Sequence, residues 1–477
     1  MKKIYAIVAF AIFILSSCDS LLEEEPLSQI GSEGFYSTTE NLNSTVKTIY
    51  TRLVSNFAQG GQFFLLNNAR EDHASGKGAY ANVTAYQGYT SDIQGFTDGA
   101  WANFYSAIRL SNFIIKYGPE IPDETTRRDQ LIAEAYFLRA FCYLHLLKNW
   151  GEVPIRTEPT EDLNVVGVPK SSKKDVYVLI VADLKRAEEG LPIQSEQSGR
   201  ATKGLAQTAL ADIYLYNEDW QLARNKAKEI IDAGTYSLVE VSTPEDFENI
   251  FGADIITHTE DIFSLKFTRQ NGTWFAQFFH QPDNIWSSRG FGNFWGLPNK
   301  YPILINWDRN DLRYQFNVYT TYTARNGQIK TNPNGWVHYA KFKDPGFNPD
   351  HGNNIPLYRY PEVLLIFAEA ENELNGPSEA AIERFNQVHR RGYGHNPLLP
   401  SPDDVVGSEL TKATFKSLII QERAYEFICE GKRWFDLLRT NTVKQVISAA
   451  KGIEVSDAHL YFPIPVQEIN SNPDISK

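Results

Sequence analysis

Pairs of amphipathic helical segments are the feature that most restricts how this chain can fold. Apolar and small residues recur at a spacing of three to four positions from Gly204 to Tyr214, and the spacing resumes at Trp220 and continues to Gly234. Small residues at repeated positions let two antiparallel helices approach closely, as stacked tetratricopeptide-type repeats do. The spacing therefore predicts a helical hairpin over residues 204–217 and 219–234.

Three more pairs and a closing helix show related spacing. The segment that starts at Leu131 is apolar nearly all round, with Leu138 and Cys142 on one face and Phe141 on another, so we expect it to be buried. The predicted pairs are 40–57 with 101–117, 129–149 with 174–191, and 361–375 with 378–391, and the closing helix spans 415–439. Their uneven spacing indicates an interrupted repeat array. The expected fold class is mostly α, with one domain over residues 31–477.

Two long insertions, at about residues 58–100 and 236–360, interrupt the helical pattern. Loops of this length are usually functional or disordered, and the abundance of aromatic residues argues against disorder. The second insertion holds five of the nine tryptophans, namely Trp274, Trp286, Trp295, Trp307 and Trp336. Tryptophan and tyrosine can stack on sugar rings or flat ligands while neighbouring polar side chains bond to hydroxyl groups.

The insertions therefore supply the candidate ligand-binding residues. From the first insertion we expect Tyr80, Tyr86 and Tyr89 as stacking faces, with Arg70 and Asp72 as polar partners, and from the second we expect Trp274, Trp286 and Trp295. The alternative for each aromatic residue is a small core beneath its insertion. Trp101, Trp150, Trp220 and Trp434 lie within or beside helical motifs, so we assign them to packing.

The N-terminus carries the pattern of an export signal. Lys2 and Lys3 precede an apolar run that ends at Leu15, and Leu15-Ser16-Ser17-Cys18 looks like a lipobox. The run is too short to span a membrane as a helix. We expect residues 1–17 to be a lipoprotein signal peptide, Cys18 to carry the lipid anchor (palmitate), and residues 18–30 to form an acidic tether. The alternative is an ordinary secretory signal with a chance cysteine.

Net charge and cysteine content bear on the partners and on the disulfide bonds that this chain can have. The formal net charge of the 477 residues is −12, and it becomes −14 without Lys2 and Lys3. Such an acidic chain argues against nucleic acid as a partner. Cys142 and Cys429 lie in apolar helical contexts and are expected to be buried thiols, although a bridge between them stays open.

The sequence shows no motif of a metal, cofactor or catalytic site. His-Glu-x-x-His spacing, a phosphate loop, a dinucleotide fingerprint and a Gly-x-Ser-x-Gly elbow do not occur, so we expect no cofactor, no metal and no catalytic residues. A charged run contains Glu422, Arg423, Glu426, Glu430, Arg433 and Asp436. Opposite charges at three-to-four spacing favour structural ion pairs over the carboxylate pair of a glycosidase.

Several motifs extend over most of the chain and occur in the following order: Ala133 to Ala140, Asn149 to Pro154, Tyr358 to Val363, Ala368 to Ala370, Glu422 to Phe427, Glu430 to Leu437, and Phe462 to Pro465 with Glu468 and Asn472-Pro473. Together these segments resemble the SusD/RagB family of outer-membrane nutrient-binding lipoproteins.

The resemblance implies a fold and a function. The implied fold is SusD-like, with four tetratricopeptide-like helix pairs and irregular excursions that carry the ligand contacts. The implied role is to capture oligosaccharides, or sometimes peptides, at the cell surface and to deliver them to a SusC-like TonB-dependent transporter, with no bond chemistry. A surface-anchored glycoside hydrolase and a protein-binding helical scaffold remain as alternatives.

Overall fold

The computed structural model describes residues 36–57, 62–123, 125–159, 167–273, 275–287, 290–347 and 349–476. Helices dominate it, as the sequence predicts. The long helices are α3 (Thr39–Phe57), α6 (Ser91–Tyr117), α7 (Thr125–Trp150), α8 (Lys173–Gly190), α9 (Lys203–Tyr216), α10 (Trp220–Ala233), α14 (Tyr360–Asn375), α15 (Glu379–Gly392) and α16 (Lys412–Glu426).

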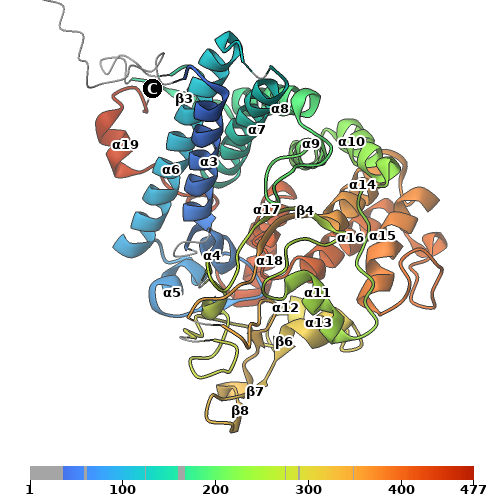
Figure 1. Ribbon diagram of the computed structural model, residues 1–477. Helices are drawn as coiled ribbons and strands as arrows, with labels where there is room; N and C mark the ends of the chain where they lie inside the picture. Colours follow the sequence, from blue (N-terminus) through green and yellow to red (C-terminus); the bar gives the residue numbers. More distant parts are fainter. Residues whose placement is uncertain are drawn as a thin grey trace, which may run out of the picture.

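Helices that the sequence pairs also pack against each other. Helix α3 contacts α6, α7 contacts α8, α9 contacts α10, and α14 contacts α15. In Figure 1 these helices form a curved array that begins with α3 and α6 and continues through α9 and α10 to α14 and α15. The irregular segments gather below the array in this view.

Helix α6 begins earlier than the sequence pattern predicts. It starts at Ser91 instead of Trp101, and the side chain of Thr90 caps it by accepting a hydrogen bond from the Ile93 backbone N–H at 3.4 Å. The added part contains Gly95 and Gly99, which are poor helix formers and hide the helix from a pattern-based reading. The first insertion therefore ends about ten residues earlier than expected.

The predicted closing helix over 415–439 is wrong as a single element. It is divided into α16 and α17 (Arg433–Arg439). Between them Cys429 and Gly431 have φ values of 62° and 70°, in the left-handed region that an α-helix cannot continue through. A further helix, α18 (Val443–Lys451), follows α17.

The buried helix α7 is joined to its neighbours by ion pairs. Arg139 pairs with Asp183 of α8 at 2.7 Å, and Lys148 pairs with Asp212 of α9 at 2.7 Å. Truncating one partner of such a buried pair leaves an uncompensated charge, so these pairs hold the helices in one arrangement.

The second insertion is built from short antiparallel strand pairs and short helices. Strand β4 (Asp261–Leu265) pairs with β10 (Ile355–Arg359), which leads directly into α14. Within the same insertion, β6 (Val318–Tyr319) pairs with β9 (His338–Tyr339), and β7 (Thr321–Thr323) pairs with β8 (Ile329–Thr331). Strand β5 (Phe294–Trp295) pairs with β1 (Ser75–Gly76) of the first insertion. The β7–β8 hairpin projects at the bottom of Figure 1. Outside the insertion, β2 (Val153–Pro154) pairs with β3 (Lys170–Ser171).

One continuous hydrophobic core joins the helices to the insertion. It includes Leu138 of α7 and Leu364 of α14 together with Phe294 and Trp307 of the insertion. Cys142 and Cys429 are both buried and unbridged, and burial raises the pKa of the Cys142 thiol. Within the described ranges, every helix is too short or too polar to cross a membrane.

Candidate functional site

Two stacked tryptophans form a partly exposed aromatic surface in the second insertion. The rings of Trp295 and Trp336 lie with their centroids 4.7 Å apart and their planes at 17°. Both side chains are partly exposed. We refer to this pair as the tryptophan platform. A flat, partly exposed indole pair is suited to stacking against a sugar ring or another flat ligand face.

Backbone pairing fixes the platform on both sides. Trp295 lies opposite Ser75 in the β1–β5 pair, and the preceding Phe294 is fully buried. Because successive side chains of a strand point to opposite faces, Trp295 faces away from the core. Gly296 and Val337 exchange backbone hydrogen bonds of 2.8 and 3.1 Å, which places Trp336 beside Trp295.

Polar side chains lie next to the platform. Asn293 immediately precedes β5, and its side-chain Nδ2 donates a hydrogen bond to the Lys77 carbonyl at 3.4 Å. Its backbone carbonyl accepts a hydrogen bond from the Lys77 N–H at 3.0 Å. A Cβ atom on Gly292 would lie 3.3 Å from Gln281 Oε1 and 3.5 Å from Lys77 Nζ, so these two side chains converge beside it. Amide and ammonium groups next to an aromatic face can bond to ligand hydroxyl groups.

Trp286, the other predicted residue of this insertion, is partly exposed like Trp295 but makes different contacts. Trp286 is half-buried, and its ring meets the ring of Tyr319 edge to face at 5.3 Å and 85°. Lys343 Nζ lies 5.7 Å from the centre of the Trp286 ring. These contacts are packing contacts within the insertion. Trp274 lies outside the described residues, as do Cys18, the signal peptide and the acidic tether.

Of the three predicted tyrosines of the first insertion, two are buried and the third is partly buried. Tyr80 is 2 % exposed and contacts Phe278 and Phe294. Tyr86 is buried and donates a hydrogen bond to the Arg70 carbonyl, while Tyr89 is half-buried against Phe462. Tyr80 and Tyr86 therefore have no free face for stacking in this structure, and the alternative of a core beneath the insertion describes them.

The predicted polar partners are buried with them. The Arg70 guanidinium lies 4.1 Å from the centre of the Phe462 ring and 4.6 Å from that of Trp434, and burial lowers its pKa to about 10. Burial opposes ionisation of Asp72, but two 3.0 Å contacts with Arg433 outweigh it and lower the pKa of Asp72. Both side chains thus serve internal contacts.

Trp336 is the platform residue that sequence reasoning did not select. It follows an Asn-Pro-Asn-Gly run in which Asn334 and Gly335 have φ values of 57° and 69°. Such a run is a strong turn signal, and a turn that displays a tryptophan is a recognisable indication of exposure. Of the four tryptophans assigned to packing, Trp101, Trp150 and Trp434 are buried, and Trp220 is half-buried beneath Lys416.

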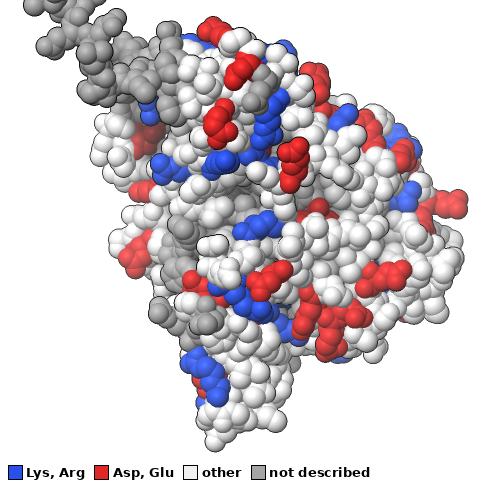
Figure 2. Space-filling view, viewed as in Figure 1, with Lys and Arg blue, Asp and Glu red and all other residues white. Residues whose placement is uncertain are grey.

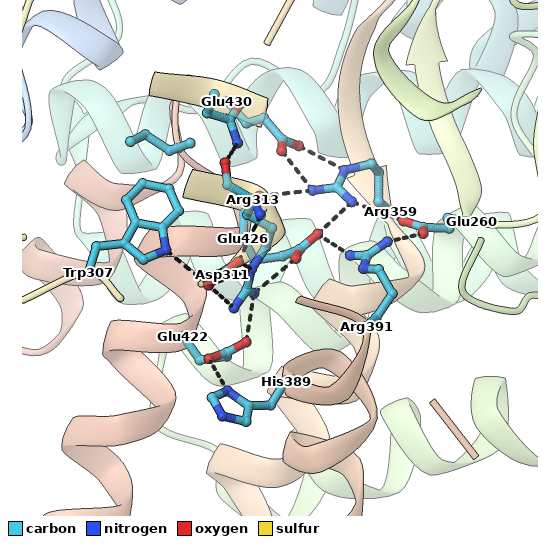
Figure 3. A network of polar contacts seen from close by, with 12 residues as sticks. Glu260, Trp307, Asp311, Arg313, Arg359, His389, Arg391, Glu422, Glu426 and Glu430 are labelled. Atoms are coloured by element: carbon cyan, nitrogen blue, oxygen red, sulfur yellow. Dashed lines mark hydrogen bonds and ion pairs between the residues drawn. The ribbon is translucent and has the colours of Figure 1, made fainter. Parts of the chain in front are cut away.

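The charged run of α16 forms a buried ionic network (Figure 3). Arg313 contacts Glu422 at 2.6 Å, Arg359 contacts Glu426 at 2.9 Å, and Arg359 also contacts Glu430 at 2.7 Å. The prediction of ion pairing is confirmed, but most partners come from other elements and not from the same helix. Burial would raise the pKa of Glu422, yet Arg313 and His389 lower it to about 2. A carboxylate held ionised in this way is unsuited to act as a general acid.

The described residues give no sign of a metal site. In that part of the chain, no group of three or more His, Cys, Asp and Glu side chains is placed to hold a metal ion.

Comparison with known proteins decides the family. Residues 254–477 match the sequence model of the SusD family, and residues 21–215 match a model described as starch-binding and associating with the outer membrane. The two ranges do not overlap and together take in most of the chain. The chain belongs to the SusD family.

Individual relatives and solved structures agree with this SusD-family assignment. SusD-like protein P2 from Formosa agariphila is 26 % identical and aligns with 100 % of this chain and 99 % of its own length. A SusD homolog from Bacteroides thetaiotaomicron has a TM-score of 0.79 at 20 % identity, covering 94 % of this chain and 98 % of the homolog. Surface glycan-binding protein A from the same organism, in complex with laminarihexaose, has a TM-score of 0.72 at 21 % identity, covering 91 % and 97 %.

The resemblance found in the sequence motifs is thereby confirmed. A SusD-family protein is a binding protein that associates with the outer membrane, and it is not an enzyme. The fold similarity extends over both the helical array and the insertion, because more than nine-tenths of the chain aligns with the solved structures.

Proposed function

We propose that this SusD-family protein is a lipid-anchored, cell-surface glycan-binding protein that captures an oligosaccharide on the tryptophan platform. The observation that carries the proposal is the pair of stacked, partly exposed indoles of Trp295 and Trp336. The laminarihexaose complex of a protein with the same fold supports a glycan as ligand. Peptide capture on the same surface is the second candidate, because indole faces also pack against apolar side chains.

The proposal includes the anchor and the partner that the sequence implies. Cys18 carries the lipid, and the captured ligand passes to a SusC-like TonB-dependent transporter in the outer membrane. Support comes from the lipobox pattern and from the outer-membrane description of the matched family model. The stacked surface binds each sugar unit weakly, and several contacts along an oligomer raise the affinity.

A glycan array followed by isothermal titration tests ligand capture. The soluble protein that begins at Asp19 is expected to bind one class of oligosaccharide, and Trp295→Ala or Trp336→Ala is expected to weaken binding by about 1–3 kcal/mol, by analogy with base stacking on aromatic residues. Trp220→Ala is the matched control, because Trp220 lies on α10 beneath Lys416 and outside the platform. Equal affinity in both platform variants and the wild type contradicts the proposed site.

Delivery is tested on the full chain in membranes. A large TonB-dependent barrel is expected to co-purify with the protein from solubilised outer membranes, and Cys18→Ser is expected to release the protein from them. Isolation of the protein without any barrel, from membranes in which the barrel is present, contradicts the transport role.

A further inference from the structure

A polar cleft of about 380 Å³ lies between the loop that joins α8 to α9, residues 191–202, and the segment that leads through β4. Neither tryptophan of the platform lines it. Figure 2 shows this face of the molecule hollowed between the helices at the top and the region of β4, with charged side chains of both signs around the hollow. Its volume falls within the range of pockets that hold small ligands.

The loop on one side of the cleft is fixed by hydrogen bonds at its end. The backbone N–H of Lys203 donates to the Pro192 carbonyl at 2.8 Å, and that of Ala201 donates to Tyr50 Oη at 2.8 Å. Arg200 donates to both carboxylate oxygens of Glu134 at 2.7 and 2.5 Å. A wall held in this way loses little conformational freedom when a ligand binds.

An aromatic ring forms another wall. Tyr236 is partly exposed and lies against the first turn of α9, where a Cβ atom on Gly204 would come within 2.5 Å of Tyr236 Oη. Glycine at position 204 therefore makes room for the ring. The ring gives the cleft an apolar face, while its hydroxyl is already hydrogen-bonded to the side chain of Thr202.

The floor and edges of the cleft carry neutral hydrogen-bonding groups. His258 Nδ1 is buried and has no hydrogen-bond partner among the described residues. Burial lowers the pKa of His258, so the ring is neutral near pH 7 and adds no charge to the cleft. The other lining side chains include amides and hydroxyls, namely Gln194, Ser195, Gln197, Thr257 and Thr259.

The charged groups at the cleft are already paired. Arg200 contacts Glu134, and Lys266 contacts Asp261. The lining therefore offers no free charge to an anion or a cation at these positions. An apolar ring face combined with neutral amides and hydroxyls is complementary to a neutral, polyhydroxylated ligand.

From this chemistry we propose that the cleft between loop 191–202 and β4 is a second oligosaccharide-binding site, separate from the tryptophan platform. The inference rests on the proposed function, because it assigns the same class of ligand to a second position. Two sites on one molecule let a glycan that is long enough to reach both bind more tightly than a short one without any new contact, since the second binding event is intramolecular.

Titration of a platform-free variant tests the second site. The probes are laminarihexaose and a panel of neutral oligosaccharides of similar length. Trp295→Ala/Trp336→Ala is expected to retain binding of the panel member that the wild type binds, weakened about tenfold or more. Adding Gln197→Trp, which fills the cleft from an exposed position, is expected to abolish the remaining binding.

Two further variants keep the result interpretable. Thr257→Trp fills the cleft from its other side and is expected to act like Gln197→Trp. Gln221→Trp, at an exposed position of α10 outside the cleft, is expected to leave the remaining binding unchanged. Complete loss of binding in the platform-free variant overturns the second site and leaves the proposed function standing. Residual binding that survives both cleft substitutions also overturns the second site. Failure of the wild type to bind any panel member overturns both proposals.

Discussion

Gly296 shows how one residue supports the tryptophan platform. A Cβ atom there would lie 2.5 Å from Leu304 Cδ1, 2.6 Å from Tyr339 Oη and 2.9 Å from Val337 Cγ2. All three neighbours are almost fully buried, so they cannot move aside freely. We expect Gly296→Ala to lower the free energy of unfolding by about 1–3 kcal/mol through overpacking, and to weaken glycan binding because Trp295 shifts. Thermal unfolding and titration measure the two effects.

Gly95→Ala is the control for Gly296→Ala and is expected to change the free energy of unfolding in the opposite direction. Gly95 is an exposed residue within α6, and a Cβ atom there would meet nothing within 4 Å. Alanine is expected to raise the free energy of unfolding by about 0.5–1 kcal/mol, because glycine is the poorer helix former. A Gly296→Ala protein as stable as the wild type would show that the platform strand can relax.

Helices α15 and α16 are joined by an interaction that depends on pH. His389 Nδ1 of α15 lies 3.0 Å from Glu422 Oε2 of α16, and burial, which would lower the pKa of His389, is outweighed by Glu422, which raises it. The buried ionic network of Figure 3 has one more acidic than basic member. The acidic members are Glu260, Asp311, Glu422, Glu426 and Glu430, and the basic members are Arg313, Lys341, Arg359 and Arg391. A protonated His389 balances the network.

The stability of this helix pair is therefore expected to fall with rising pH. Because the folded pKa of His389 lies above the unfolded value of 6.5, its contribution is fully present below pH 6.5 and is lost as the pH rises through the folded pKa. His389→Gln should destabilise the protein at pH 6 and have a smaller effect at pH 9. Chemical denaturation at both pH values measures the difference.

His395→Gln is the matched control for the pH effect. His395 pairs with Asp403, and both side chains are substantially exposed, so the pair contributes little to stability. An equal loss of stability at pH 6 and pH 9 in His389→Gln would rule out protonation as the cause.

At the scale of the whole molecule, Arg359 joins the insertion to the helical array. It lies on β10 and contacts Glu260 before β4 at 3.0 Å and Glu426 of α16 at 2.9 Å. Arg359→Met removes one partner from each of three buried carboxylates, Glu260, Glu426 and Glu430, and we expect it to lower the free energy of unfolding by about 3–5 kcal/mol. Chemical denaturation measures the loss, and limited proteolysis within residues 236–360 is expected to become faster.

A surface ion pair serves as the control for Arg359. Lys228 and Asp232 are both more than half exposed, so Lys228→Ala is expected to change the stability by less than about 0.5 kcal/mol. If Arg359→Met melts like the wild type and resists protease equally well, the insertion docks through its hydrophobic core alone.

Much of the helical array follows from the sequence, because helical periodicity is a local property. The spacing of Ala206, Leu210 and Ile213 requires one buried helical face whatever lies against it. The early start of α6 and the division of α16 from α17 are missed for local reasons too. Glycines weaken the helical pattern at the start of α6. The spacing of apolar residues does not predict the left-handed backbone at Cys429, which separates α16 from α17.

The sequence by itself determined the helical repeats, the aromatic character of the insertions and the family, since each depends on residue types at short spacing. Only the tertiary structure decided which aromatic residues face solvent. Trp295 is partly exposed on a strand that pairs with Ser75, and its ring stacks on that of Trp336. Tyr80, in contrast, is covered by Phe278 and Phe294. The exposure of each side chain depends on which distant segments of the chain pack against it. The spacing of residue types along the sequence cannot predict those contacts.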